Sequence, residues 1–165
     1  PAGNGLPEES VALLLSPAAK TVYAVIGKEG IYRTRDGGNS WSNASSGLPG
    51  GEVRQLAVSS SNAAALYAAT EHGLFQSTDG GDSWRRTGAS LKEDDVEAVV
   101  VAPNGDVYAG AFEGVYRSTD GGASWKQING ALANVDVRAL AIEPGSPARL
   151  YAGFGGGSVW STALP

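Results

Sequence analysis

The stretch RSTDGGASW at residues 117–125 decides how this chain folds, because it is one of three near-copies. The others are RTRDGGNSW at residues 33–41 and QSTDGGDSW at residues 76–84. Asp-Gly between alternating strands is a strong hairpin signal, since glycine tolerates the positive φ that a tight turn requires. Each copy therefore predicts a tight hairpin turn followed by a tryptophan.

A longer repeat surrounds these turns. Four tyrosines, Tyr23, Tyr67, Tyr108 and Tyr151, lie 44, 41 and 43 residues apart, and each follows an apolar run. In the first three units the turn and its tryptophan come after the tyrosine. A period of this length indicates a repeat architecture. The predicted units span approximately residues 8–49, 50–91, 92–133 and 134–165, with residues 1–7 as the tail of a further strand.

Each unit is predicted to contain four short antiparallel strands. The first is the apolar run (VALLLS, VRQLAVS, VEAVVVA or VRALAIE), which we expect to be buried on both faces. The second holds the tyrosine and, in the first three units, ends at Gly30, Gly73 or Gly114. The fourth starts at the tryptophan. Evenly spaced short strands with many turn signals predict an all-β chain: one β-propeller domain, or part of one, built of four-stranded blades.

The aspartates of the three turns, Asp36, Asp79 and Asp120, allow two interpretations. They could form a catalytic or metal-binding set, or each could accept hydrogen bonds from its own turn. A catalytic residue is rarely needed once per repeat, so the repetition favours the structural role. The residues to which we assign this structural role are Thr34, Asp36, Gly38, Trp41, Ser77, Asp79, Gly81, Trp84, Ser118, Asp120, Gly122 and Trp125.

The pattern Ser/Thr-x-Asp-x-Gly-x-x-Trp in these turns resembles the Asp-box of the bacterial-neuraminidase-repeat (BNR) propellers. It is similar to the repeats of sialidases, xyloglucan hydrolases, sortilin-type receptors and the YCF48-like photosystem II assembly factors. Three full matches and a degenerate fourth unit, with Leu164 at the aspartate position, cover nearly the whole chain. The resemblance implies the propeller fold. It implies no single function, because such propellers include enzymes, receptors and assembly factors.

The two ends of the chain leave two arrangements open. NGLPEESV at residues 4–11 matches SGLPGGEV at residues 46–53, while the last unit stops after its third strand, at VWSTALP. Residues 1–6 could complete the last unit and close a small ring. Alternatively, the chain is a segment of a larger propeller that pairs with another chain or was excised. Methionine is absent even at position 1, which is consistent with a removed export signal, so we expect an extracytoplasmic location, secreted or periplasmic.

Composition excludes several classes of function. A net charge of −5 argues against a nucleic-acid partner, whose phosphates require a basic surface. No apolar run is long enough to cross a membrane, so no membrane insertion is expected. Without cysteine there is no disulfide, thiol nucleophile or thiolate metal site.

Acidic residues concentrate at one end of the predicted propeller. Propeller loops alternate between two ends, and ten of the seventeen acids fall in the loops of one end, with only Lys28 and Lys92 among them. This end could dock a basic protein patch or a divalent cation, or could be a solvated face that keeps a glycine-rich protein soluble. No Asp-x-Asp-x-Asp calcium loop is present, so we expect no cofactor and name no metal ligand. The candidate binding face comprises Glu29, Glu52, Arg54, His72, Glu93, Asp94, Asp95, Glu97, Glu113, Asp136 and Arg138.

Three members of this face, Arg54, Glu97 and Arg138, occupy equivalent positions at the start of the first strands of their units. Arginines there could bind a carboxylate or a sugar. The alternative is that both arginines pair with Glu97 and with neighbouring loop acids. The lone histidine, His72, is expected to be an exposed loop residue.

The sequence contains no converging catalytic set. One histidine makes a Ser-His-Asp triad implausible, and the arginines are scattered across strand types. We therefore predict a non-catalytic protein-interaction or assembly module that binds a protein partner, or itself, through the acidic loop face. The alternative is part of a carbohydrate-active enzyme, a sialidase-like or xyloglucanase-like glycoside hydrolase, or a sugar-binding, lectin-like propeller.

Overall fold

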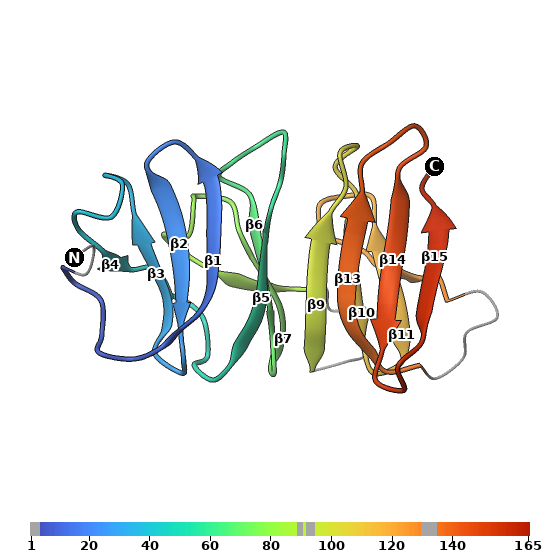
Figure 1. The fold of residues 1–165 in the computed structure, drawn as a ribbon, viewed down its shortest axis with the longest axis horizontal. Coiled ribbons are helices and arrows are strands. Elements are labelled where there is room, and N and C mark those ends of the chain that lie inside the picture. Colours follow the sequence, from blue (N-terminus) through green and yellow to red (C-terminus); the bar gives the residue numbers. More distant parts are fainter. Residues whose placement is uncertain (1–3, 89–90, 92–94, 130–134) are drawn as a thin grey trace.

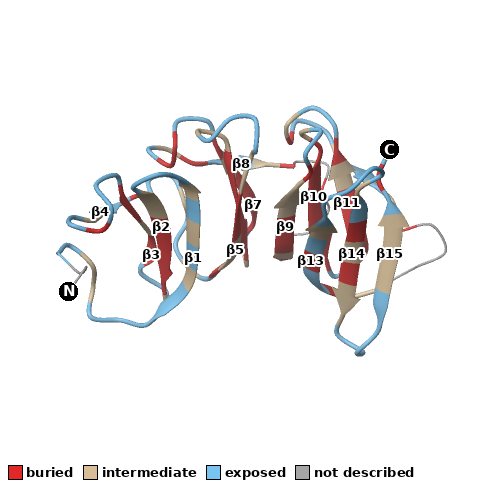
Figure 2. Ribbon diagram, turned by 45° about the horizontal axis from the view of Figure 1, so that its top comes forward, coloured by how far each residue is buried: buried red, intermediate tan, exposed pale blue. Residues whose placement is uncertain are grey.

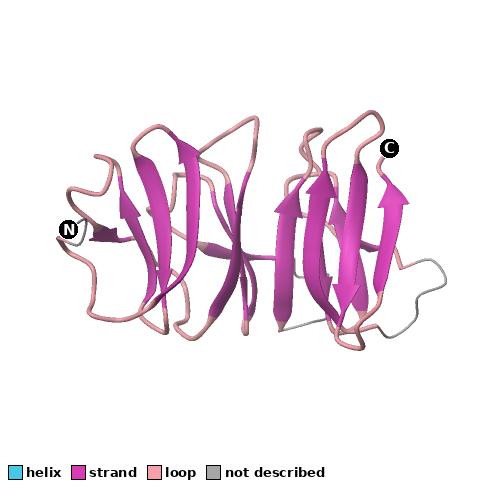
Figure 3. Ribbon diagram, viewed as in Figure 1, coloured by secondary structure: helices cyan, strands magenta, loops and turns pink. Residues whose placement is uncertain are grey.

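A computed structural model describes residues 4–88, 91, 95–129 and 135–165 of the chain. Within these residues the regular structure is entirely β-strand (Figure 3). The strands form four separate antiparallel sheets, three with four strands and the last with three. We call these sheets blades 1 to 4 in chain order. The predicted all-β chain of antiparallel blades is confirmed.

The strands follow one another across each blade in chain order. Blade 1 contains β1 (Val11–Ala18), β2 (Thr21–Ile26), β3 (Gly30–Thr34) and β4 (Ser42–Asn43). Blade 2 contains β5 (Val53–Val58), β6 (Leu66–Thr70), β7 (Gly73–Ser77) and β8 (Arg85–Thr87). Blade 3 contains β9 (Val96–Val101), β10 (Val107–Ala111), β11 (Gly114–Ser118) and β12 (Lys126–Gln127). Blade 4 contains β13 (Val137–Glu143), β14 (Arg149–Phe154) and β15 (Val159–Ala163).

The blades stand side by side in an open arc, with the two chain termini at opposite ends (Figure 1). Neighbouring blades contact each other through their first strands: β1 packs on β5, β5 on β9, and β9 on β13. The turns between first and second strands lie at the upper end in Figure 1. The loops between second and third strands, and those that enter each first strand, lie at the lower end, which we call the loop end.

The hydrophobic core consists of three clusters, one between each pair of neighbouring blades. Alternate side chains of a strand point to opposite faces, so each blade contributes to the cluster before it and to the cluster after it. Figure 2 shows the resulting buried strands in the middle of the arc. Among the buried side chains are Tyr23, Ile31, Leu56 and Trp84 between blades 1 and 2, Tyr67, Leu74 and Val99 between blades 2 and 3, and Tyr108, Val115 and Leu140 between blades 3 and 4.

The first strand of blade 1 corrects the prediction that these strands are buried on both faces. Leu14 pairs with Ala24 in the register that Leu56, Val99 and Leu140 have in the later blades. Leu14 is 65% exposed, whereas the three equivalents are 5%, 0% and 6% exposed. The reason is that the equivalents pack on the preceding blade, and no described sheet precedes blade 1.

Blade 4 shows the complementary exposure. Val159, which pairs with Gly153, occupies the position in the third strand that Ile31, Leu74 and Val115 occupy in blades 1 to 3. Those three side chains are 0%, 1% and 1% exposed, because they pack on the following blade, whereas Val159 is 72% exposed. No described sheet follows blade 4.

The described part of the N-terminal segment lies beside blade 1, at the far end of the open arc from blade 4 (Figure 1). The backbone N–H of Trp41 donates to the carbonyl oxygen of Asn4 at 2.8 Å, as the N–H of Trp84 donates to Ser46 at 2.8 Å. Asn4 therefore takes the place that Ser46 holds at the exit of a preceding fourth strand. This place is at the opposite end of the arc from β15 (Figure 1), so described residues 4–6 do not complete blade 4.

Two strand boundaries also differ from the prediction. The fourth strands β4, β8 and β12 begin one residue after the tryptophan. The reason in blades 1 and 2 is that the backbone N–H of the tryptophan donates its hydrogen bond to the segment before that blade, Asn4 or Ser46, and not to the tryptophan's own sheet. The glycines expected to end the second strands, Gly30, Gly73 and Gly114, instead open the third strands β3, β7 and β11.

Candidate functional site

The three Asp-Gly-Gly turns (residues 34–41, 77–84 and 118–125) share one hydrogen-bond pattern. In the first, Thr34 Oγ1 donates to Asp36 Oδ1 at 2.7 Å and accepts from the Gly38 N–H at 2.9 Å. Asp36 Oδ1 also accepts from the Ser40 N–H at 3.0 Å, and Asp36 Oδ2 accepts from Ser40 Oγ at 2.6 Å. Both carboxylate oxygens are therefore bonded within the turn itself.

The other two turns repeat these contacts. Ser77 donates to Asp79 Oδ1 at 2.7 Å, and Ser118 donates to Asp120 Oδ1 at 2.7 Å. The backbone N–H groups of Ser83 and Ser124 each donate to the aspartate at 2.9 Å. Both glycines of every turn have positive φ, between 69° and 99°, which other residues adopt only at a cost.

These hydrogen bonds hold the aspartates in the charged form. The Ser40 hydroxyl is the main cause that lowers the pKa of Asp36, and the Ser83 hydroxyl does the same for Asp79. The Ser124 hydroxyl lowers the pKa of Asp120 to about 2. Donors to a carboxylate stabilise its ionised form. A general acid or base needs a pKa near the working pH, and these carboxylates are shifted away from it.

The tryptophans after the turns are not equally buried. Trp84 is 3% exposed, and its Nε1–H donates to the carbonyl oxygen of Ala44 in blade 1 at 2.7 Å. Trp125 is half-buried, and its Nε1–H donates to Gly122 of its own turn at 3.0 Å. Trp41 is also half-buried, beside the N-terminal segment. Trp84 thus joins two blades.

The Asp-Gly-Gly turns of blades 2 and 3 are also held by the blade before them, a feature that sequence reasoning missed. Tyr23 Oη donates to the carbonyl oxygen of Gly80 at 2.8 Å, and Arg33 Nη1 donates to the same oxygen. Arg33 Nη2 bonds Asp82 Oδ1 at 2.7 Å. Arg33 is buried, so this ion pair is partly shielded from water. Blade 1 therefore clamps the turn of blade 2.

Blade 2 holds the turn of blade 3 in the same way. Tyr67 Oη donates to Gly121 at 3.1 Å, and Gln76 Nε2 donates to the same carbonyl oxygen at 2.8 Å. The signal in the sequence is the residue after the aromatic of the third strand, in YRT, FQS and YRS. We call this pair, a second-strand tyrosine with a third-strand arginine or glutamine, the turn clamp.

The corresponding pair in blade 3, Tyr108 and Arg117, does not contact a described turn of blade 4. Tyr108 is fully buried, and its hydroxyl makes no hydrogen bond of ordinary geometry with the described residues. Arg117 turns back to Asp106, with Nε and Nη2 at 2.9 and 2.6 Å from Oδ2. Burial raises the pKa of Tyr108, so the phenol stays a donor at neutral pH.

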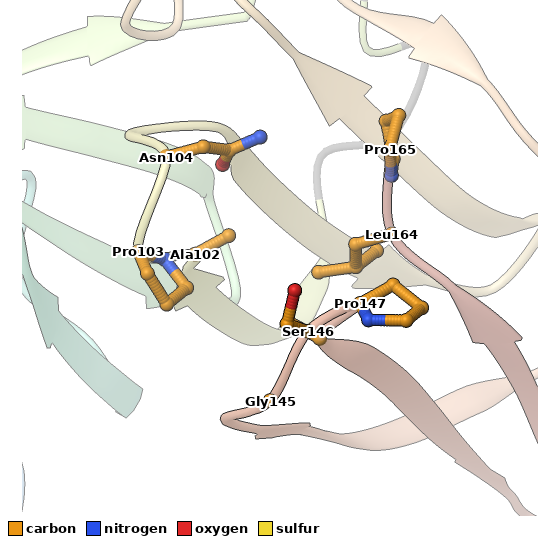
Figure 4. A pocket seen from close by; sticks show the side chains of 9 residues that line it. Ala102, Pro103, Asn104, Gly145, Ser146, Pro147, Leu164 and Pro165 are labelled. Carbon is orange, nitrogen blue, oxygen red and sulfur yellow. The ribbon is translucent and has the colours of Figure 1, made fainter.

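A pocket of about 490 Å³ opens at this end of blades 3 and 4 (Figure 4). Leu164 and Pro165, which follow β15, line one side of it. Ala102, Pro103 and Asn104 come from the turn between β9 and β10, and Gly145–Ala148 from the turn between β13 and β14. Its labelled side chains carry few polar atoms and no charge, which is unlike a catalytic cleft.

The described acidic residues of the candidate binding face lie at the loop end. Glu93 and Asp94 fall outside the described residues. Glu29, Glu71, His72 and Glu113 lie in loops between second and third strands, and Glu8, Glu9, Glu52, Asp95 and Asp136 lie in the segments that enter first strands.

Arg54, Glu97 and Arg138 are brought together on β5, β9 and β13. Glu97 Oε1 accepts from Arg54 Nη1 and, at 3.0 Å, from Arg138 Nη1. Arg54 also contacts Asp95 at 3.1 Å, and Arg138 contacts Asp136 at 2.6 Å. The predicted pairing of both arginines with Glu97 and loop acids is present. We call this set of residues, Arg54, Asp95, Glu97, Asp136 and Arg138, the arginine–glutamate ladder.

The loop-end acids of blade 2 tie two loops together. Glu71 Oε1 accepts from the backbone N–H of Glu52 at 2.9 Å, and the Glu71 N–H donates to the Glu52 carbonyl oxygen at 3.3 Å. His72 Nε2 lies 3.9 Å from Glu71 Oε1, and its side chain is 52% exposed. His72 is thus an exposed loop residue, as predicted.

A second hollow lies at the loop end of blade 4, with a volume of about 630 Å³. Asp136 and Arg138 of the ladder line it, with Phe154, Gly155 and Ser158. Among the described residues, no three His, Asp or Glu side chains are grouped closely enough to hold a metal ion. In the same part of the chain, no helix is long and apolar enough to span a membrane.

Comparison with protein-family models and with curated proteins finds no match. Solved structures do match in fold. The GH74 enzyme of Niastella koreensis aligns with a TM-score of 0.68 at 20% identity, over 98% of this chain and 29% of that one. YCF48, solved with a bound D1 peptide, aligns with a TM-score of 0.62 at 20% identity, over 87% of this chain and 48% of that chain.

The WD40 β-propeller domain of Doa1 aligns with a TM-score of 0.67 at 16% identity, over 92% of this chain and 50% of that chain. The chain spans about a third or less of the GH74 enzymes that it matches. These likenesses show a β-propeller fold, of which the chain contains part. The structures that align include enzymes and a protein solved with a bound peptide.

Proposed function

We propose that this chain is a non-catalytic protein-interaction or assembly module that binds a basic partner surface through its loop end. The observation that carries the proposal is the charge of that end. Nine described carboxylates lie there against four described lysines and arginines, Lys28, Arg54, Arg86 and Arg138. Arg54 and Arg138 are already engaged by the ladder, and the carboxylates outnumber the cations, so the end presents negative charge to a partner.

The acids that remain outside the ladder are available for docking. Glu8, Glu9 and Glu29 are exposed, Glu113 is half-buried, and none forms an ion pair with another described residue. A face with one sign of charge attracts an oppositely charged partner and speeds its association. YCF48, which has the same fold, is described bound to a peptide, and this supports the proposal.

A catalytic role has weaker support. The turn aspartates are bonded within their own turns, and the ladder carboxylates are bonded to arginines. Neither set leaves two free carboxylates facing each other, as glycoside hydrolysis requires.

The proposal is tested with a peptide of alternating lysine and glycine as the probe, by fluorescence anisotropy. Binding should weaken strongly between about 0.02 M and 0.2 M salt, because exposed charges are screened over that range. Glu29→Gln combined with Glu113→Gln should reduce affinity several-fold. The control is Asp82→Asn combined with Glu143→Gln, which removes the same charge at the other end. Equal losses in the two variants, or no salt dependence, would contradict the proposal.

The second candidate function is that of a carbohydrate-active propeller segment, favoured by the structural likeness to GH74 enzymes. One of these is described as a xyloglucanase. Incubation of the chain with xyloglucan, with reducing ends measured against time, tests this alternative directly. Release of oligosaccharides would replace the first proposal. The extracytoplasmic location stays a prediction, which fractionation of the source cells would test.

A further inference from the structure

We propose that two copies of this chain associate head to tail, with blade 4 of each copy packing on blade 1 of the other, to form one closed ring of eight blades. The surfaces involved are the outer face of blade 1 around Leu14 and the outer face of blade 4 around Val159. This inference is independent of the binding role proposed for the loop end.

The chain itself shows what covers each face. The position of Leu14 is filled three more times, by Leu56, Val99 and Leu140, and each time it is buried against the blade before it. The face before blade 1 is therefore the same kind of surface as those that already pack on a preceding blade.

The outer face of blade 4 is the matching half. At the position of Val159, the side chains of Ile31, Leu74 and Val115 are at most 1% exposed, because the following blade covers them. At each internal junction, the face of one blade that carries the Val159 equivalent therefore packs on the face of the next blade that carries the Leu14 equivalent. The two terminal faces are one of each type, so a second copy supplies the partner that each lacks.

The N-terminal segment also indicates that a blade packs on the outer face of blade 1. Asn4 accepts a hydrogen bond from the Trp41 N–H, as Ser46 of blade 1 accepts one from Trp84 of blade 2. A segment that resembles the exit of a preceding blade therefore already lies beside blade 1. The outer edge of β15, where a fourth strand would pair, has no described strand on it.

The count of blades favours a two-copy ring. Head-to-tail interfaces close into a ring only when the rotation between copies adds up to a full turn. One copy forms an open arc whose first and last blades lie at opposite ends (Figures 1 and 2). Two copies contribute eight blades, which is within the usual range of roughly four to eight for a closed propeller.

The test is the mass of the purified chain in solution, by sedimentation and light scattering over a range of concentrations. The expected species has twice the chain mass of 16.8 kDa. Leu14→Lys and Val159→Lys should each weaken association by at least about tenfold, because each replaces an apolar contact by a charge that must be desolvated. Phe112→Lys is the control, since Phe112 is 61% exposed but lies in a loop of blade 3, away from both faces.

Mixing the two lysine variants separates head-to-tail pairing from a symmetric contact between like faces. A mixed dimer retains one unmodified junction, between blade 4 of the Leu14→Lys copy and blade 1 of the Val159→Lys copy, so mixing should restore part of the association. Circular dichroism confirms that each variant is folded. A monomer at every concentration, a series of species larger than two copies, or a dimer that resists Val159→Lys would overturn the proposal.

Discussion

The hydroxyl of Tyr67 in blade 2 donates a hydrogen bond to the carbonyl oxygen of Gly121, in the Asp-Gly-Gly turn of blade 3, at 3.1 Å. Tyr23 and Gly80 repeat this relationship one blade earlier, at 2.8 Å. The repeats are therefore joined by directional contacts as well as by apolar packing. Tyr23 and Tyr67 are buried core residues, and their hydroxyls also hold the turn of the next blade.

Tyr67→Phe should lower the free energy of unfolding by about 0.5–1.5 kcal/mol, the net worth of one hydrogen bond. Tyr108→Phe is the matched control, because the Tyr108 hydroxyl has no such acceptor among the described residues. Its removal should be neutral or slightly stabilising. Urea unfolding followed by fluorescence measures both. A larger loss for Tyr108→Phe than for Tyr67→Phe would contradict the turn clamp.

Ser77→Ala should destabilise the chain by about 1–3 kcal/mol, because it leaves the buried backbone N–H of Gly81 without an acceptor. Ser77 is 1% exposed, and its hydroxyl oxygen accepts from the Gly81 N–H at 2.8 Å. Ser61→Ala, on an exposed turn, should change stability by less than about 0.5 kcal/mol. Chemical denaturation of both variants provides the comparison.

Trp84→Ala should cost about 3–5 kcal/mol, since it removes a large side chain buried between blades 1 and 2. Trp41→Ala should cost less, because Trp41 is only half-buried. Thermal unfolding of the two variants would show the difference. Similar losses would mean that the two tryptophans contribute alike despite their different burial.

Stability should fall in acid as the turn aspartates become protonated. A carboxylate whose pKa is lower in the folded chain stabilises it fully above the unfolded value of 3.8, and this contribution is lost as pH falls through the folded value. For Asp120 the window runs from about 4 down to about 2. Unfolding temperatures measured from pH 7 to pH 2 should drop in this window, and Asp120→Asn should reduce the drop. Glu8→Gln, at an exposed residue, serves as the charge control.

Glu97→Gln should destabilise the chain by about 2 kcal/mol, because two arginines then lose their shared anion. The Glu97 side chain is 16% exposed, and that of Arg54 is 19% exposed. Arg138→Gln should cost under about 1 kcal/mol, since the Arg138 side chain is 56% exposed and water screens its ion pairs. Equal losses in urea unfolding would show that the ladder does not act through its less exposed members, Arg54 and Glu97.

Much of this molecule was predictable because its signals are local. The Asp-Gly-Gly turns contain their own hydrogen-bond donors and acceptors, so three of them mark three hairpins without knowledge of the rest. The apolar runs and tyrosines then place the strands. The boundaries at Trp41 and Trp84 were wrong by one residue, because their N–H groups bond to a segment of another blade.

The candidate site was predicted less well, because it depends on which blades are neighbours. The pairing of Arg54 and Arg138 with Glu97 was foreseen from their equivalent positions. The partnership of Arg33 with Gly80 and Asp82 was not, since the polar residue after the third-strand aromatic does not by itself show that its side chain reaches the turn of the next blade. Glu93 and Asp94 lie outside the described residues, so their place on the loop end stays a prediction.

By itself, the sequence determined the hairpins, the repeat and the antiparallel sheets, because each depends on residues close together in the chain. Only the tertiary structure decided which copies of a repeated position are covered. Leu14 and Leu56 are the same residue type in the same register, yet one is exposed and the other buried. The physical reason is that burial belongs to the pair of packed blades, and no single repeat encodes its neighbour.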